Sequence, residues 1–68
     1  MLKFDLGQTY ICTEANGYTR WTVGKKYQVI LELRMLEYVL IDDDGGDWID
    51  HELDNLYGLK FELKSEIK

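Results

Sequence analysis

Short turn signals recur about every ten residues along the chain, which leaves little room for a long helix. Each of them contains glycine: Gly7, Asn16-Gly17, Gly24, Gly45-Gly46 and Gly58. Between these turns, apolar and polar residues tend to alternate with a period of two, which is typical of strands that bury one face. The sequence therefore predicts a mainly β protein made of short strands.

Several segments have the composition of strands. They are residues 8–14, 27–33, 38–42, 48–51 and 59–63. Residues 52–57 are expected to form a helical turn that Gly58 ends. Residues 1–6 alternate too loosely to decide whether they join the sheet, and residues 18–23 fit either a return strand or an open loop.

Residues 27–33 alternate most regularly, with one side formed by Tyr27, Val29, Leu31 and Leu33. A helix over residues 27–40 is the main alternative, because leucine, glutamate, arginine and methionine favour helices. The period of two and the flanking glycines favour two strands joined by a turn at residues 34–37. Residues 38–41 are apolar on both faces, which is typical of a strand that is covered on both sides.

The chain of 68 residues is expected to be a single domain, 1–68, with residues 65–68 frayed. A chain this short buries only about 60% of its unfolded surface, so its margin of stability is small. Cys12 is the only cysteine, which suits a reducing compartment. The sequence shows neither a signal peptide nor an apolar run of the ~18 residues that a membrane span needs. We therefore expect a cytoplasmic protein.

Charge is spread unevenly over the chain, whose net charge is −5. Residues 32–54 contain nine acidic residues and a single base, Arg34. An acidic middle is unfavourable for binding a phosphate backbone, which needs clustered lysine and arginine. It is favourable for docking on a basic protein.

Residues 42–47, Asp-Asp-Asp-Gly-Gly-Asp, suggest a calcium-binding loop at first sight. An EF-hand needs acids at loop positions 1, 3 and 5, glycine at position 6 and glutamate at position 12. Gly45 at position 6 would put Leu40 at position 1, and Gly46 there would put Ile41 at position 1. Both registers fail, so we interpret the segment as a hairpin turn and expect no metal or cofactor. A weak divalent-cation site of another kind is the alternative.

The residues that usually carry catalysis are sparse. His51 is the only histidine, and we expect neither a histidine-based catalytic triad nor a zinc site in this chain. Cys12 lies within a predicted strand and is typical of a small core residue. Paired aspartates on a turn are screened by water. We therefore expect no catalytic residues and a protein that is not an enzyme.

Short motifs along the chain together resemble those of small SH3-like barrel proteins from phages and prophages. They are Tyr10-Ile11-Cys12, Gly24-Lys25-Lys26-Tyr27-Gln28-Val29, Ile41-Asp42-Asp43-Asp44-Gly45, Trp48 and Phe61-Glu62-Leu63. The resemblance covers most of the chain. It implies a mainly β fold, a small five-stranded SH3-like barrel with one short helical turn before the last strand, and an origin in a mobile element. Residues 14–23 would be the long first loop.

The expected function is that of a non-enzymatic protein-interaction module, encoded by a phage, that binds and modulates a host protein. Its contact residues would be acidic and aromatic: Asp42, Asp43, Asp44, Asp47, Asp50, Tyr18, Trp21 and Trp48. The sharpest form of this hypothesis is a nucleic-acid-binding host protein, such as a defence nuclease, whose phosphate sites the carboxylates would occupy. The alternative interpretation of the tryptophans is structural, because a small core needs large side chains.

Two further functions remain open. An apolar patch of Ile30, Val39 and Ile41 would support a homodimer, and with it a small structural or assembly component. Direct binding of nucleic acid would need a basic face, formed by Lys3, Arg20, Lys25, Lys26 and the lysines of residues 60–68. We rank this last function lowest, because the chain as a whole is acidic.

Overall fold

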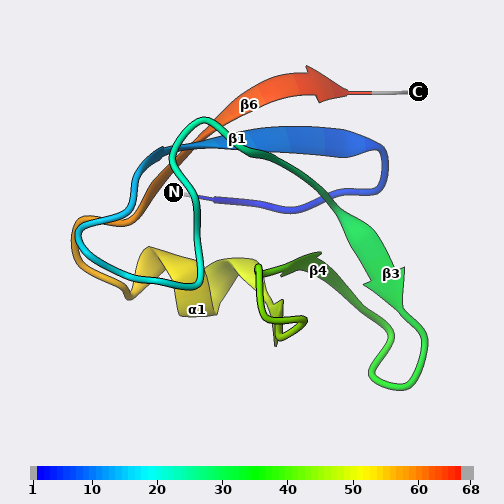
Figure 1. Ribbon diagram of the computed structural model, residues 1–68. Coiled ribbons are helices and arrows are strands. Elements are labelled where there is room, and N and C mark those ends of the chain that lie inside the picture. Colours follow the sequence, from blue (N-terminus) through cyan, green and yellow to red (C-terminus); the bar gives the residue numbers. More distant parts are fainter. Residues whose placement is uncertain (1, 67–68) are drawn as a thin grey trace.

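The computed structural model describes residues 2–66, which form six strands and one short helix (Figure 1). In chain order these are β1 (Gln8–Glu14), β2 (Lys26–Gln28), β3 (Ile30–Glu32), β4 (Glu37–Ile41), β5 (Asp47–Trp48), α1 (Asp50–Asp54) and β6 (Lys60–Glu66). The protein is therefore mainly β, as the sequence predicts. Within residues 2–66, no helix has the length and apolar character needed to cross a membrane.

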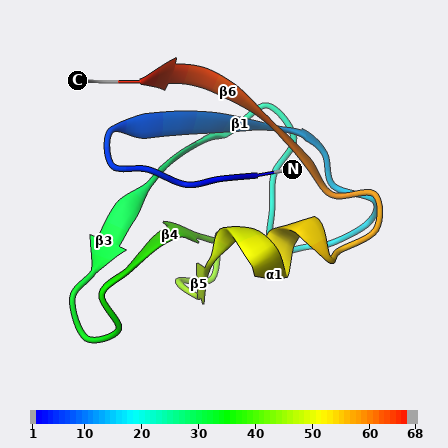
Figure 2. The same ribbon diagram turned by 180° about the vertical axis from the view of Figure 1, so that it is seen from behind.

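The strands form two antiparallel three-stranded sheets, with the orders β2-β1-β6 and β3-β4-β5. Only Val29 separates β2 from β3, so one bent segment passes from the first sheet into the second. A 2.9 Å hydrogen bond from the N–H of Val29 to the carbonyl of Gln8 holds the bend, and the Val29 side chain is buried. Figures 1 and 2 show β1 and β6 above, with β4 and α1 below them.

The two sheets do not close into the five-stranded barrel that the resemblance implied. β5 contains only two residues, which pair with Leu40 and Ile41 of β4. The chain then turns into α1 instead of extending this edge. The carboxylate of Glu52 accepts a 2.9 Å hydrogen bond from the N–H of Ile49, and Asp50 adds negative charge at the first turn, so the helix begins here. The architecture of the described residues is thus two small sheets around one core.

Residues 27–40 form strands and a turn, as predicted, and not a helix. The alternation predicts one continuous strand at the start of this segment, whereas the structure divides it at Val29. Tyr27 and Val29 are buried, but Leu31 and Leu33 are exposed. The reason is that β3 and the turn after it project away from the core, as the lower right of Figure 1 shows.

The remaining segments differ from the prediction mainly at their ends. β1 spans the predicted residues, and residues 18–23 form an open loop instead of a return strand. α1 begins at Asp50, earlier than predicted, and thereby shortens the preceding strand. β6 continues through residues 65–66, which were expected to fray, and residues 67–68 lie outside the described part of the chain.

One cluster of buried side chains draws on both sheets, on α1 and on the loops. Its members are Phe4, Tyr10, Cys12, Trp21, Tyr27, Val29, Leu40, Leu53 and Leu59. The ring centroid of Trp21 lies 4.9 Å from that of Tyr27 and 5.0 Å from that of Phe61, both in edge-on contact. Each contact of this kind adds about 1 kcal/mol to the free energy gained by burial. Aromatic rings therefore supply much of the core of this short chain.

Residues 2–6 form no strand, but two carboxylates of α1 hold them in place. Asp54 accepts hydrogen bonds from the N–H of Leu2 at 3.0 and 3.1 Å, and Asp50 accepts one from the N–H of Phe4 at 3.0 Å. Phe4 is buried, with its ring centroid 5.5 Å from that of Tyr10. The segment whose role the sequence leaves open therefore covers the core without joining a sheet.

Candidate functional site

The acidic turn between β4 and β5 is built around Asp42, whose side chain has an exposed fraction of 0%. Its Oδ1 accepts hydrogen bonds from the N–H groups of Asp44 at 2.9 Å and Gly46 at 2.8 Å. Its Oδ2 accepts one from Nε1 of Trp48 at 2.7 Å and a longer one from Nη1 of Arg20 at 3.4 Å. Burial alone would raise the pKa of Asp42, but the hydrogen bonds that it accepts outweigh burial, and the pKa is lowered.

Asp43, the next residue, faces the loop between β1 and β2. Its Oδ1 accepts hydrogen bonds from Nζ of Lys25 at 2.6 Å and from the hydroxyl of Tyr27 at 2.9 Å. Its Oδ2 accepts one from the hydroxyl of Thr22 at 2.6 Å. The Lys25 ammonium, followed by the Thr22 hydroxyl, lowers the pKa of Asp43 to about 2.

The two aspartates thus act as a clasp that holds residues 20–27 against the β4–β5 turn. A backbone hydrogen bond of 2.8 Å from the N–H of Asp43 to the carbonyl of Arg20 completes it. The sequence analysis predicted that Asp42 and Asp43 contact a partner protein. In the structure their carboxylates instead pair with Arg20 and Lys25 of the same chain.

The other predicted acids do not form one continuous surface with these two. Asp44 is exposed and lies 3.5 Å from Nη1 of Arg20. Asp50 accepts hydrogen bonds from the backbone of residues 4 and 51, so it serves the fold. Asp47 is exposed and lines a small hollow of about 260 Å³ together with Glu37 and Glu52. Asp43, Asp44 and Asp47 are thus the exposed acids of the predicted set, and among these three Asp43 is the one that accepts several hydrogen bonds from the chain.

The three predicted aromatic residues do come together. Tyr18, Trp21 and Trp48 line a pocket of about 200 Å³, with Leu56 and Arg20 beside them. Trp21 is buried at its base, and its ring centroid lies 6.4 Å from that of Trp48. We call these five residues the aromatic pocket. The structural interpretation of the tryptophans is also supported, because Trp21 belongs to the core cluster and Trp48 packs against it.

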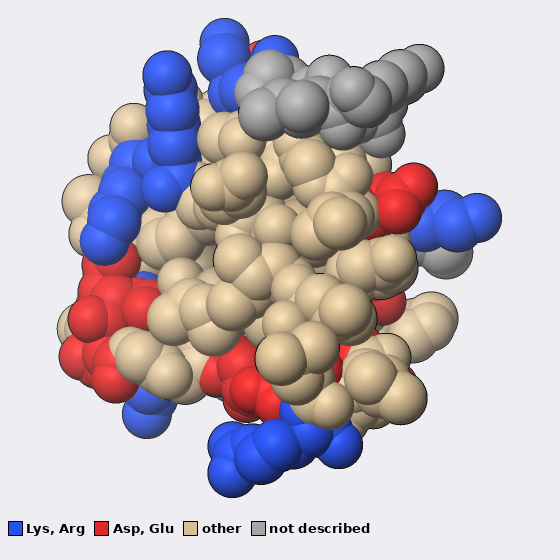
Figure 3. Space-filling view, turned by 90° about the vertical axis from the view of Figure 1, so that its right-hand side faces the viewer, with Lys and Arg blue, Asp and Glu red and all other residues tan. Residues whose placement is uncertain are grey.

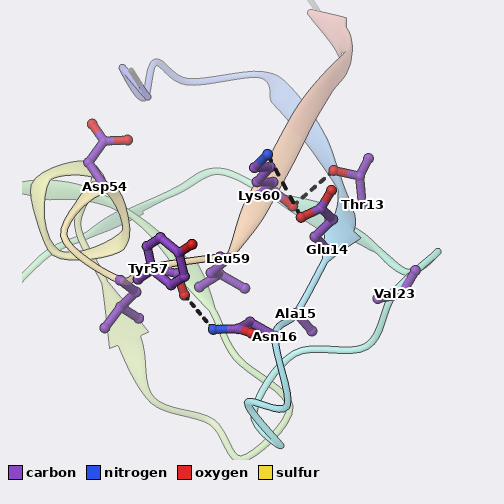
Figure 4. Close-up of a pocket in the computed structure, with 11 residues that line it drawn as sticks. Thr13, Glu14, Ala15, Asn16, Val23, Asp54, Tyr57, Leu59 and Lys60 are labelled. Carbon is purple, nitrogen blue, oxygen red and sulfur yellow. Dashed lines mark hydrogen bonds and ion pairs between the residues drawn. The ribbon is translucent and has the colours of Figure 1, made fainter.

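A larger groove of about 770 Å³ lies at the end of the molecule where two turns meet (Figure 4). Figure 4 shows Asn16 on one wall and Tyr57 on the other, and Nδ2 of Asn16 donates a 2.9 Å hydrogen bond to the carbonyl of Tyr57. Glu14 and Lys60 form a 3.8 Å ion pair at its upper rim. None of the residues predicted to bind a partner protein or to form the self-association patch lines this groove. It joins segments that are 41 residues apart, so no local sequence pattern could reveal it.

Three of the bases expected to form a nucleic-acid-binding face are paired with acids. Arg20 lies 3.4 Å from Asp42, Lys25 lies 2.6 Å from Asp43, and Lys60 lies 3.8 Å from Glu14. Hydrogen bonding to Asp43 also raises the pKa of Lys25. A charge that is neutralised within the chain attracts phosphate weakly, so this arrangement favours the role of these residues in folding.

The predicted self-association patch is only partly exposed. Val39 has an exposed fraction of 0%, so it is not available to a partner, and Ile41 is half-buried. Ile30, which faces Val39 across the hairpin, is exposed. The side chains that the sequence hypothesis missed are those of the turn that follows β3, where Leu33 and Leu36 each have an exposed fraction of 74%. Their apolar character is visible in the sequence, but Leu33 was assigned to the predicted strand of residues 27–33 and Leu36 to the predicted turn of residues 34–37.

Within residues 2–66, no three acidic, histidine or cysteine side chains converge so that they could hold a metal ion. Cys12 is buried, and burial raises the pKa of its thiol, which favours the unreactive protonated form. No protein-family model matches the sequence, and no match was found among curated proteins or among solved structures.

Proposed function

We propose that this chain is a small non-enzymatic binding protein whose aromatic pocket receives an apolar side chain of another protein. The observation that carries the proposal is the convergence of Tyr18, Trp21 and Trp48 on one open hollow of about 200 Å³. Aromatic rings that are rigidly held and partly exposed are frequent anchors in protein interfaces, because they offer large contact areas at a low entropic cost. The core fixes Trp21, and Asp42 fixes Trp48.

The proposal includes an SH3-like architecture and an origin in a phage. The strand order supports the SH3-like architecture. The bend at Val29 joins β2 of the sheet β6-β1-β2 to β3 of the sheet β3-β4-β5, and a helix precedes the last strand, β6. The sequence motifs that resemble phage-encoded barrels support the origin in a phage. The target would then be a protein of the host, which binding modulates.

The partner is expected to be basic next to its apolar anchor. The net charge of −5 supports this, and the exposed carboxylates Asp44 and Asp47 flank the clasp on the surface. Asp42 and Asp43 are excluded from the contact set, since their oxygens accept hydrogen bonds from the chain. A host nucleic-acid-binding protein remains the sharpest form of the proposal, because its surface carries clustered bases.

The experiment is an affinity capture from host lysate with the whole chain as bait, in wild-type form and with Tyr18→Ala. Tyr18 is the best residue to change, because it is half-buried in the pocket while the two tryptophans hold the fold. Tyr57→Ala is the matched control, since Tyr57 is an exposed tyrosine outside the pocket. We expect a basic protein that wild type and Tyr57→Ala retain and Tyr18→Ala loses. Equal retention by all three baits, or none by wild type, would contradict the proposal.

A further inference from the structure

The hairpin of β3 and β4 carries most of the large apolar side chains that the described residues expose. We call this set the hairpin patch; its members are Ile30, Leu31, Leu33, Met35, Leu36 and Tyr38. β3 lies on the right of Figure 1, and Figure 3 shows that side of the molecule. Uncharged side chains fill the middle of this face, and the charged groups lie around them.

The size of the hairpin patch is that of an interface rather than of ordinary surface. The exposed fractions of its six residues correspond to roughly 650 Å² of accessible surface per chain, backbone atoms included, against the ~800 Å² that each partner contributes to a standard interface. Successive residues of a strand point to opposite faces, so Ile30 lies on the other face of the hairpin from Leu31 and Tyr38. Monomeric proteins rarely leave apolar patches larger than a few hundred square ångströms in water. The hairpin patch is therefore expected to bind a partner.

Leu36, at the tip, adds an independent observation. Its φ is +55°, a left-handed conformation that glycine and asparagine adopt readily and leucine adopts only at an energetic cost. Glycine there would relieve the backbone and remove an exposed apolar group. A leucine that has a strained backbone and is 74% exposed is better explained by contact with a partner than by the needs of the turn.

The geometry of the hairpin indicates which occupant fits. β3 is at the edge of its sheet, so its outer side can pair with another strand. An antiparallel pair with β3 of a second copy would be symmetric, and it would bring Leu31 and Tyr38 of both copies onto one face, because these two residues face each other across the hairpin.

Charge also suits a second copy. Glu32 and Glu37 face each other across the hairpin, and the 3.6 Å ion pair of the highly exposed Arg34 is with Glu32. Arg34 of a second copy would bring a further cation to Glu37. The arrangement is self-complementary, because each copy offers the exposed Arg34 and also Glu37, which forms no ion pair with a base of residues 2–66.

We propose that two copies of this chain associate through the hairpin patch, with their β3 edges antiparallel about a two-fold axis. The aromatic pocket is formed by other residues and is left free, so this association is independent of the proposed binding of another protein. A small domain would gain stability from the additional burial.

The test is sedimentation equilibrium of the whole chain from micromolar to millimolar concentration. Wild type should move from the 8.0 kDa of one chain toward twice that mass. Leu36→Gly should raise the dissociation constant on the order of a hundredfold, because a two-fold interface loses two buried leucines. The same change relieves the positive φ, so the urea midpoint measured on the dilute, monomeric protein should stay equal or rise. A simple loss of folding would lower it.

Leu33→Ala and Leu6→Ala form a matched pair of controls, since both leucines are exposed but only Leu33 belongs to the hairpin patch. Leu33→Ala should weaken association, and Leu6→Ala should leave it unchanged. A wild-type mass of one chain at every concentration would overturn the proposal. So would an association that Leu36→Gly leaves intact or that Leu6→Ala weakens equally. Capture of a different protein by a wild type that stays monomeric would assign the patch to another occupant and also overturn it.

Discussion

Nε1 of Trp48 lies 2.7 Å from Oδ2 of Asp42 and donates a hydrogen bond to a carboxylate that water does not reach. This contact joins the acidic turn to the aromatic pocket, because Trp48 belongs to both. A buried carboxylate is stable only when its oxygens are hydrogen-bonded, and here two backbone N–H groups, an indole and an arginine supply the bonds. The turn is thus an internal structural element that also positions Trp48 in the pocket for which we propose a binding role.

Replacing Trp48 by phenylalanine tests this link. Trp48→Phe keeps an aromatic ring but removes the N–H donor, so we expect a loss of about 1–2 kcal/mol in the free energy of unfolding, measured in urea. In the Asp42→Asn background, the same change should cost clearly less, because the acceptor has already been altered. An equal loss in both backgrounds would show that the hydrogen bond contributes little.

The stability should depend on pH through the clasp. The pKa of Asp43 is about 2 in the folded protein, whereas an unfolded aspartate titrates near pH ~3.9. The unfolded chain therefore binds more protons in this window. The contribution of Asp43 is fully present above about pH 4 and is lost as the pH falls toward about 2; the lowered pKa of Asp42 acts in the same direction. Urea midpoints across this range should fall less steeply for Asp43→Asn than for wild type, with Asp47→Asn as the control that keeps the wild-type slope.

Two glycines with the same backbone requirement should respond differently to alanine. Gly24 and Gly58 both have positive φ, +88° and +77°, so alanine at either position should cost about 1–2 kcal/mol. A Cβ on Gly24 meets nothing within 4 Å, whereas one on Gly58 would lie 2.6 Å from Cγ of Asn16. Gly58→Ala should therefore cost at least about 1 kcal/mol more in urea unfolding, since Asn16 must move and lose its hydrogen bond to Tyr57. Equal costs would contradict the close packing of the two turns.

Cys12 should be protected from thiol reagents while the protein is folded. Its exposed fraction is 1%, and burial raises the pKa of its thiol. We expect labelling at a rate set by opening of the structure, which should rise with urea in parallel with unfolding. Rapid labelling of the folded protein in buffer would show that β1 is not covered as described.

The acidic turn shows which features a local sequence pattern can predict and which it cannot. Residues 42–47 were predicted to form a hairpin turn, and they do, because aspartate and glycine determine that geometry locally. Which aspartates face inward depends on donors that come from elsewhere, such as Arg20 and Lys25 on a loop about twenty residues earlier. The local sequence shows that these residues are charged but does not show which bases they pair with, so we predicted that the aspartates contact a partner protein.

The apolar residues show the same limit. The period of two predicted the strands between residues 27 and 41, yet it could not tell where the sheet leaves the core. Val39 and Ile30 face each other on adjacent strands, but Val39 is buried and Ile30 is exposed, because the hairpin projects beyond the covered region. Tyr18, Trp21 and Trp48, which the sequence analysis named together as possible contact residues, line one pocket, whereas the groove around Asn16 and Tyr57 was not predicted.

Asp42 and Asp43 hold residues 20–27 against the β4–β5 turn, whereas the exposed carboxylates of Asp44 and Asp47 are expected to contribute little to stability. The most direct measurement is urea unfolding at neutral pH of four single variants: Asp42→Asn, Asp43→Asn, Asp44→Asn and Asp47→Asn. Asp42→Asn should lose roughly 2–3 kcal/mol, because an amide presents an N–H group where the indole and guanidinium also donate.

Asp43→Asn should also be destabilised, whereas the two exposed variants should stay within about 0.5 kcal/mol of wild type. Four equal and small changes in the free energy of unfolding would contradict this account, because they would show that none of the four carboxylates stabilises the fold.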